Sequence, residues 1–138
     1  MKGQDILMDE FNKGAYATVV VKGMDAKGIE KIENKIENVE FIAEDAGTYM
    51  PKLYQQGLRP DVIVMDPVRA GCSEEVLKAA ASMQPKRIVY VSCNPATFAR
   101  DAKILKEQGY ELTKVQPVDM FPQTMHVECV SLLTKVQK

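Results

Sequence analysis

Three short polar segments follow runs of apolar residues that are typical of buried β-strands, and each contains a side chain that could do chemistry. They are residues 44–45 with Asp45, residues 66–69 with Asp66, and residues 92–95 with Cys93. Ligands of open α/β sheets bind beyond the carboxyl ends of the strands. If the three strands are parallel, these side chains meet at one rim of a sheet although they are far apart in the sequence.

Cys93 lies between the end of a strand and the start of a helix, for which Asn94 is a suitable N-cap and Pro95 a suitable first residue. The N-terminus of a helix favours the thiolate, which is the nucleophilic form of cysteine. A small buried residue at a strand end is the structural alternative for Cys93. For Asp66 the alternative is an acid that caps the following turn. Position alone leaves both alternatives open.

Alternating strand-like and helix-like segments must position these residues. Strands are expected at residues 18–21, 39–42, 61–65, 87–91, 111–118 and 127–136, and helices near 29–36, at 46–56, from Ser73, and from Pro95 to Gly109. Pro51 leaves the helix at 46–56 uncertain. The alternation predicts an α/β domain with a mainly parallel sheet. Residues 119–126 are too few for a crossover helix, so the last two strands should be antiparallel.

Length and composition narrow the class of protein. The chain has 138 residues, of which 46% are hydrophobic and 27% charged, as in an ordinary globular domain. A net charge of −1 excludes nucleic-acid binding through bulk positive charge. No apolar run suggests a membrane span or a secretory signal, so we expect a cytoplasmic protein without membrane contact. Cys72, Cys93 and Cys129 are expected to be free thiols, and with one histidine no metal site is expected.

Longer motifs resemble the RNA 5-methyluridine methyltransferase family, whose members use S-adenosylmethionine to modify uridines in tRNA and ribosomal RNA. The motifs are SCNPATFARD at residues 92–101, DMFPQT at 119–124, HVE at 126–128, and DPVR at 66–69 followed by Gly71. The resemblance extends from about residue 36 to residue 134. It implies a Rossmann-like class I methyltransferase fold, in which a mainly parallel sheet ends in an antiparallel hairpin.

The same resemblance implies roles for four residues. Cys93 would add to C6 of uracil and so activate C5 to accept the methyl group. Glu128, otherwise an ordinary solvated strand residue, would remove the C5 proton. Asp66 would contact S-adenosylmethionine near its reacting methyl group, and Asp45 would contact its adenosine part. The target base must leave its stack to reach such a pocket. His126 is expected to be a surface or packing residue.

Parts of the family pattern are missing. Family members carry a Gly-rich loop, Asp-x-x-Cys-Gly-x-Gly, where the backbone must come close to the cofactor, and Gly23 and Gly28 do not reproduce it. The family's N-terminal RNA-binding domain is also absent. We therefore expect residues 1–138 to form a single, N-terminally truncated catalytic domain, with residues 18–21 in the first or second strand position. Asp25 is a candidate for the acid that binds the cofactor ribose.

The missing parts have two expected consequences. A sheet without one of its strands exposes unpaired backbone groups, so we expect a homodimer. Without the Gly-rich loop, we expect weak cofactor binding.

Two other functions stay open. One alternative function is a non-catalytic remnant that binds RNA or a protein. The other is an amino-group methyltransferase, because Asn94-Pro95 is similar to that class's Asn-Pro-Pro-aromatic motif. The missing second proline and aromatic residue, and the pair of Cys93 and Glu128, argue against it.

Overall fold

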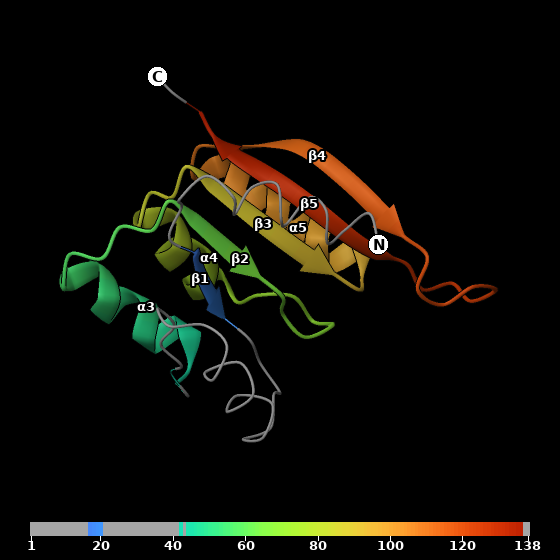
Figure 1. Ribbon diagram of the computed structural model, residues 1–138, viewed down its shortest axis with the longest axis horizontal. Coiled ribbons are helices and arrows are strands. Elements are labelled where there is room, and N and C mark those ends of the chain that lie inside the picture. Colours follow the sequence, from blue (N-terminus) through green and yellow to red (C-terminus); the bar gives the residue numbers. More distant parts are fainter. Residues whose placement is uncertain (1–16, 21–41, 43, 137–138) are drawn as a thin grey trace.

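The computed structural model describes residues 17–20, 42 and 44–136 of the chain. The described residues alternate between strands and helices as the sequence predicts, which confirms the α/β class (Figure 1). In chain order the elements are β1 (Ala17–Val20), α3 (Ala46–Gln55), β2 (Val62–Met65), α4 (Glu74–Ser82), β3 (Arg87–Ser92), α5 (Pro95–Glu107), β4 (Tyr110–Val118) and β5 (Glu128–Lys135).

The described strands form one sheet in the order β1-β2-β3-β5-β4. The pairs β1–β2 and β2–β3 are parallel, whereas β5 is antiparallel to both of its neighbours. The sheet therefore ends in an antiparallel hairpin, as predicted from the short connection between the last two strands. The last strand of the chain lies between β3 and β4, and Figure 1 shows it as the red arrow beside the orange β4.

β1 is an edge strand of the described sheet. It pairs with β2 from Ala17 opposite Val62 to Val20 opposite Met65. Ile42 lies outside any strand; the rest of the strand expected at 39–42, the helix near 29–36, and Asp25 fall outside the described residues.

All three described helices pack on one face of the sheet (Figure 1). Their buried side chains, such as Leu77 of α4 and Leu105 of α5, meet Ile63 of β2 and Tyr90 of β3 in the larger core. Alternate strand residues point to the other face and form a second cluster. That cluster consists of Val62, Val64, Val89, Val130 and Leu132, with Val91 packed against it.

Local sequence explains where the described helices begin. Asp45, Ser73 and Asn94 are the N-caps, and each side chain accepts a hydrogen bond from a backbone N–H of the first turn. The caps expected at Ser73 and Asn94 are thus confirmed. Helix α3 continues through Pro51, so the uncertainty there is resolved in favour of the helix. Among the described residues, no helix combines the length and the apolar character that a membrane span requires.

Candidate active site

Three of the four predicted site residues lie at the carboxyl end of the parallel strands. Asp66 directly follows β2, and Cys93 directly follows β3. Glu128 is the first residue of β5. Because β5 runs antiparallel to β3, the start of β5 lies beside the end of β3. Residues that are up to 62 positions apart in the sequence are therefore placed at one end of the sheet.

Cys93 and Glu128 lie at the same end of the β3–β5 pair. The pairing of the two strands ends with Ser92 opposite Cys129. Cys93 is the next residue after β3, and Glu128 is the residue before Cys129 in β5. Both residues are half-buried. The thiol and the carboxylate thus come from neighbouring chain segments at one end of the sheet.

The alternation of side chains also assigns Glu128 to a face. Glu128 continues the row of Val130 and Leu132 in β5, which belong to the second cluster. Glu128 therefore lies on the face of the sheet that is opposite to the described helices.

Hydrogen bonds fix the backbone on the C-terminal side of Cys93. The buried Ser92 hydroxyl accepts from the Asn94 N–H at 3.1 Å and donates to the Asn94 carbonyl at 2.9 Å. The Asn94 side chain in turn accepts from the Ala96 N–H at 3.1 Å, as the N-cap of α5. Cys93 is therefore held between a strand end and a capped helix start, as its sequence position predicts.

Asp66 and Asp45 occupy different parts of this end of the molecule. Asp66 directly follows β2 and begins the loop that joins β2 to α4. Although Asp66 is exposed at the surface, partial desolvation raises the pKa of its carboxyl group. Asp45 is exposed at the start of α3, where its Oδ1 accepts from the Thr48 N–H and hydroxyl at 3.1 and 3.0 Å. No hydrogen bond or ion pair joins Asp45 to the other three residues in the described part of the chain.

The surroundings of the other two cysteines disfavour the thiolate. Burial raises the pKa of the Cys72 thiol, and burial together with the charge of Glu128 raises the pKa of the Cys129 thiol. All three cysteines are free, and Cys93 is the one that lies between a strand end and a helix start.

One contact in the site was not foreseen from the sequence. Arg69 Nη2 lies 3.0 Å from Nδ1 of His126, and because an arginine can only donate, the imidazole nitrogen accepts. Arg69 lies in the loop after β2 and His126 in the loop before β5. Since β3 lies between these strands, the contact crosses the end of β3, where Cys93 lies. His126 is thus a half-buried partner of Arg69 rather than a plain surface residue.

A buried carboxylate beneath this end of the sheet was also missed. Asp101 is 0% exposed and accepts hydrogen bonds from the Tyr90 hydroxyl at 2.5 Å and the Cys72 N–H at 2.8 Å. The sequence contains a signal for it, because Asp101 shares a helix face with Phe98 and Leu105, both buried. A charge on an apolar helix face requires buried partners.

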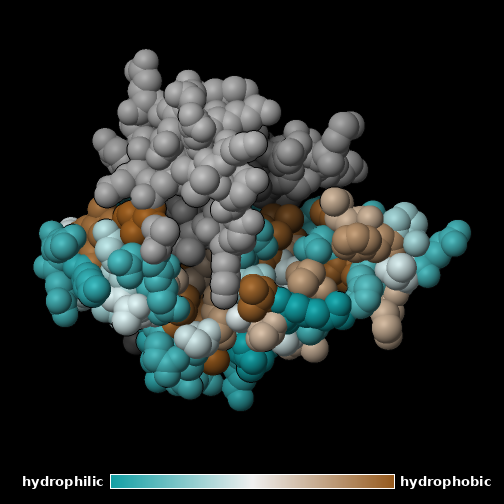
Figure 2. Space-filling model, turned by 90° about the horizontal axis from the view of Figure 1, so that it is seen from below, coloured by the Kyte–Doolittle hydropathy of each residue, from teal (hydrophilic) through white to brown (hydrophobic). Residues whose placement is uncertain are grey.

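The same end of the molecule carries exposed apolar side chains. They belong to the loop between β4 and β5: Met120 is 61% exposed, Phe121 53% and Met125 92%. In Figure 2, tan and brown residues lie among teal ones towards the right-hand end, where Figure 1 places this loop. Such side chains offer apolar contact area next to Cys93 and Glu128.

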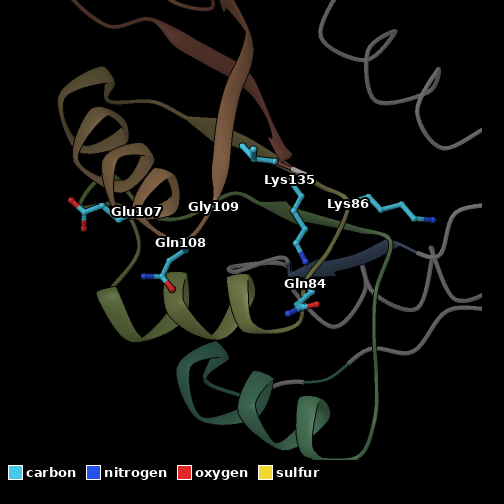
Figure 3. A pocket seen from close by; sticks show the side chains of 7 residues that line it. Gln84, Lys86, Glu107, Gln108, Gly109 and Lys135 are labelled. Atoms are coloured by element: carbon cyan, nitrogen blue, oxygen red, sulfur yellow. The ribbon is translucent and has the colours of Figure 1, made fainter. Parts of the chain in front are cut away.

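A hollow at the opposite end of the sheet is unrelated to these residues. It has a volume of about 800 Å³, and most of the side chains around it are polar or charged (Figure 3). Its lining residues are Gln84, Lys86, Glu107, Gln108, Gly109, Lys135 and Val136. Within the described ranges, no three His, Cys, Asp or Glu side chains come together in a way that could hold a metal ion.

Comparison with known proteins identifies the family. The family model described as tRNA (uracil-5-)-methyltransferase matches residues 7–136. The chain belongs to this family. The resemblance read from the motifs is thereby confirmed, and the match also includes residues that precede those motifs.

Curated relatives of this chain are considerably longer. An uncharacterised RNA methyltransferase of Oceanobacillus iheyensis is 59% identical over 101 residues, which cover 73% of this chain and 22% of the relative. Another, from Streptococcus mutans, is 43% identical over 150 residues and is matched by 95% of this chain and 33% of its own length. The chain thus spans about a fifth to a third of the length of such relatives.

Solved structures agree with the family and with the fold. The tRNA (uracil-54, C5)-methyltransferase of Pyrococcus abyssi, crystallised with S-adenosyl-L-homocysteine, is 45% identical with a TM-score of 0.50, over 54% of this chain and 18% of that one. Fibrillarin of Aeropyrum pernix, crystallised with S-adenosyl-L-methionine, has a TM-score of 0.59 at 16% identity, over 83% of this chain and 54% of its own. These neighbours confirm the Rossmann-like class I methyltransferase fold.

Proposed function

We propose that residues 1–138 form a single, partial catalytic domain of an enzyme that transfers a methyl group from S-adenosylmethionine to C5 of a uridine in tRNA or ribosomal RNA. One observation supports the proposal: in a member of the uracil-5 family, Cys93 follows the end of β3 and Glu128 begins β5, the strand paired antiparallel with β3. A nucleophile and a base from these two neighbouring segments would act on the two adjacent carbons C6 and C5 of one uracil ring.

The proposed reaction uses the side chains of Cys93 and Glu128 one after the other. The Cys93 thiolate forms a bond to C6, and the electron pair of the C5–C6 double bond moves onto C5 and the C4 carbonyl. C5 would then take the methyl group as the bond between that methyl group and the sulfonium sulfur breaks, and neutral S-adenosylhomocysteine would leave. Glu128 removes the proton that C5 still carries, the C5–C6 double bond forms again, and the bond between C6 and the Cys93 sulfur breaks. Both the thiolate and the aromatic uracil are recovered, so atoms and charge balance.

S-adenosylmethionine supplies an electrophilic methyl group on a positively charged sulfonium. Carboxylates at the strand ends suit such a ligand, because they attract the cation and accept hydrogen bonds from hydroxyl and amino groups. Asp66 lies next to the candidate pair and would face the reacting end. Asp45 uses its Oδ1 to cap α3, and its Oδ2, which makes no hydrogen bond within the described part of the chain, would accept from the adenosine part.

The RNA contacts proposed for this chain are local. A net charge of −1 gives no general attraction for phosphates. RNA-binding proteins commonly stack unpaired bases on aromatic side chains, and Phe121 is an exposed aromatic residue in the loop before β5. The target uridine would be turned out of its stack, with its neighbours held by this loop.

The test uses a chimera in which the upstream parts of the Oceanobacillus iheyensis relative precede this chain. Cys93→Ala should abolish methylation and any covalent RNA adduct. Glu128→Gln should trap the methylated adduct, because attack and methyl transfer precede the step that needs the base. The adduct should survive denaturing electrophoresis and be absent from the double variant. The matched controls are Cys72→Ala and Glu111→Gln, a half-buried thiol and an exposed carboxylate outside the candidate pair.

Two results would overturn the assignment of roles. One is normal turnover by Glu128→Gln, and the other is an adduct formed by Cys93→Ala. If the chimera binds RNA but neither binds S-adenosylmethionine in calorimetry nor methylates, the chain is a non-catalytic binding domain.

For the 138-residue chain alone we expect weak cofactor binding. A low micromolar dissociation constant, equivalent to about −8 kcal/mol, would contradict this expectation.

The proposal also covers assembly and location. β4 is an edge strand of the described sheet, and its Leu112 and Val115 are 41% and 49% exposed. Edge strands with apolar side chains tend to pair with another chain, so we propose a homodimer, to be tested by light scattering; a monomer at high concentration would contradict it. The three free cysteines fit a reducing compartment such as the cytoplasm.

A further inference from the structure

The loop of residues 66–73 joins β2 to α4 and carries two of the side chains discussed above. Asp66 begins the loop, and Arg69 reaches across the end of β3 to His126. Asp66 and Arg69 are both exposed, so apolar packing does little to hold them in place. At its other end the Cys72 side chain packs against the larger core, and between these ends the path of the loop depends on hydrogen bonds to its backbone.

One face of α5 supplies those hydrogen bonds. Thr97, Arg100 and Asp101 lie three and four residues apart and so share a helix face. The Thr97 hydroxyl donates to the Arg69 carbonyl at 3.1 Å. The Arg100 guanidinium donates to the carbonyls of Ala70 and Cys72 at 3.0 and 3.1 Å. Each partner in the loop is a backbone group, so α5 fixes the path of the chain whatever side chains the loop carries.

Asp101 is the centre of this arrangement. Its Oδ2 accepts from the Cys72 N–H of the loop and from the hydroxyl of Tyr90 in β3. Its Oδ1 pairs with Arg100 at 2.6 Å. A fully buried carboxylate is tolerated only where its partners are in place. The buried charge thus couples three elements: the loop, β3 and α5.

Gly71 leaves the room that this contact requires. Its φ is +80°, and a Cβ atom there would lie 2.6 Å from Asp101 Oδ2 and 2.7 Å from Arg100 Nη2. The Gly71 N–H also donates to the Val68 carbonyl at 2.8 Å, which closes a turn inside the loop. The backbone of the loop therefore packs directly against the ion pair of Arg100 and Asp101.

We propose that Asp101 is a positioning residue, which with Arg100 holds the loop of residues 66–73 so that Asp66 and Arg69 lie at the carboxyl end of β3, beside Cys93. Asp101 itself lies on the helix side of the sheet, and its hydrogen bonds and ion pair are made with Tyr90, Cys72 and Arg100, not with Cys93 or Glu128. It acts through the loop. The statement that Asp66 and Arg69 serve methyl transfer rests on the proposed function. The statement that Asp101 holds their loop in place does not rest on it.

The first arm of the test measures the loop in the 138-residue chain by amide hydrogen exchange. Asp101→Asn keeps the shape of the side chain and removes its charge. Exchange at Gly71 and Cys72 should become at least tenfold faster than in a matched control, Tyr110→Phe. Tyr110 is also a buried tyrosine with one hydrogen bond, from its hydroxyl to the Pro85 carbonyl at 2.8 Å, but it lies at the other end of the sheet.

The single histidine gives a second, independent signal. The imidazole resonance of His126 reports its contact with Arg69, so Asp101→Asn should shift it and Tyr110→Phe should not. If Asp101→Asn does not fold, Tyr90→Phe replaces it, since it removes only the hydroxyl that Asp101 accepts. Either of two results would overturn the proposal. One is that the loop exchanges equally fast in Tyr90→Phe and Tyr110→Phe, and the other is that the His126 signal is unchanged in Asp101→Asn.

The second arm uses the chimera at a temperature where all variants are folded. Asp101→Asn should lower kcat/KM for methyl transfer at least tenfold relative to Tyr110→Phe. An unchanged kcat/KM would show that the loop is held for stability alone and would overturn the catalytic part of the proposal. If the parent chimera transfers no methyl group, the proposed function fails, and the exchange arm still decides whether Asp101 positions the loop.

Discussion

Substituting Gly71 by alanine tests how tightly the loop after β2 is packed on α5. The change adds one methyl group at a position with φ of +80°, where the new Cβ would lie 2.6 Å from Oδ2 of Asp101. Asp101 is 0% exposed and bonded on both oxygens, so it has little freedom to move away. The substitution therefore combines backbone strain with a steric overlap.

A matched control separates the two effects. Gly57 has φ of +91°, and a Cβ there would meet nothing within 4 Å. An L-residue in the left-handed region costs about 1–2 kcal/mol, which both variants share. Overpacking a tight site costs a further ~1–3 kcal/mol. Gly57→Ala should thus lose about 1–2 kcal/mol of unfolding free energy, and Gly71→Ala about 2–5 kcal/mol.

Urea unfolding of the 138-residue chain measures both values. The difference between the two variants should be at least about 1 kcal/mol, which is roughly 4 °C in Tm for a chain of this size. The overlap should also depend on the carboxylate, so the effect of Gly71→Ala should shrink when Asp101 is replaced by alanine. Equal losses for Gly57→Ala and Gly71→Ala would refute the packing of the loop described above.

Two further predictions concern the core and the response to alkali. Leu77→Ala, at a 0% exposed position of α4, should cost about 2–5 kcal/mol in urea unfolding, whereas Leu58→Ala, 41% exposed, should cost under about 1 kcal/mol; similar losses would contradict the packing of α4. Burial raises the pKa of Tyr110 to about 12 from its usual 10, so its contribution to stability is complete below pH 10 and is lost as the pH rises towards 12. Tyr110→Phe should therefore show a smaller fall in stability over this interval than the parent chain, and an identical fall would contradict the shift.

The elements that the sequence predicts correctly are those whose signal is local. Val62–Met65 is an apolar run with no polar interruption, and it forms the buried strand β2. Ser73 and Asn94 cap their helices because a side-chain oxygen at that position satisfies an otherwise free backbone N–H. The strand expected at residues 111–118 is also found, extended by one residue at its start.

What the sequence did not reveal depends on contacts between distant segments. Arg69 and His126 are 57 residues apart, and each is plausible as a solvated surface side chain. Their contact follows only once β5 is known to lie next to β3. The role of Asp101 was hidden for the same reason, since its partners Tyr90 and Cys72 come from two other elements.

The reversed direction of β5 is what brings Glu128 to the end of β3, where Cys93 lies. If β5 ran parallel to β3, its first residue would lie at the amino end of the sheet, and Glu128 would be separated from Cys93 by the length of β3. Six residues at roughly 3.3 Å each make that separation about 20 Å, too far for the proposed mechanism, in which one uracil ring contacts both groups. The short loop of residues 119–127 forces the reversal, because it leaves no room for a crossover helix. The same short loop carries the exposed Phe121 and the His126 that contacts Arg69. One connection thus determines both where Glu128 lies and which side chains precede it at this end of the sheet.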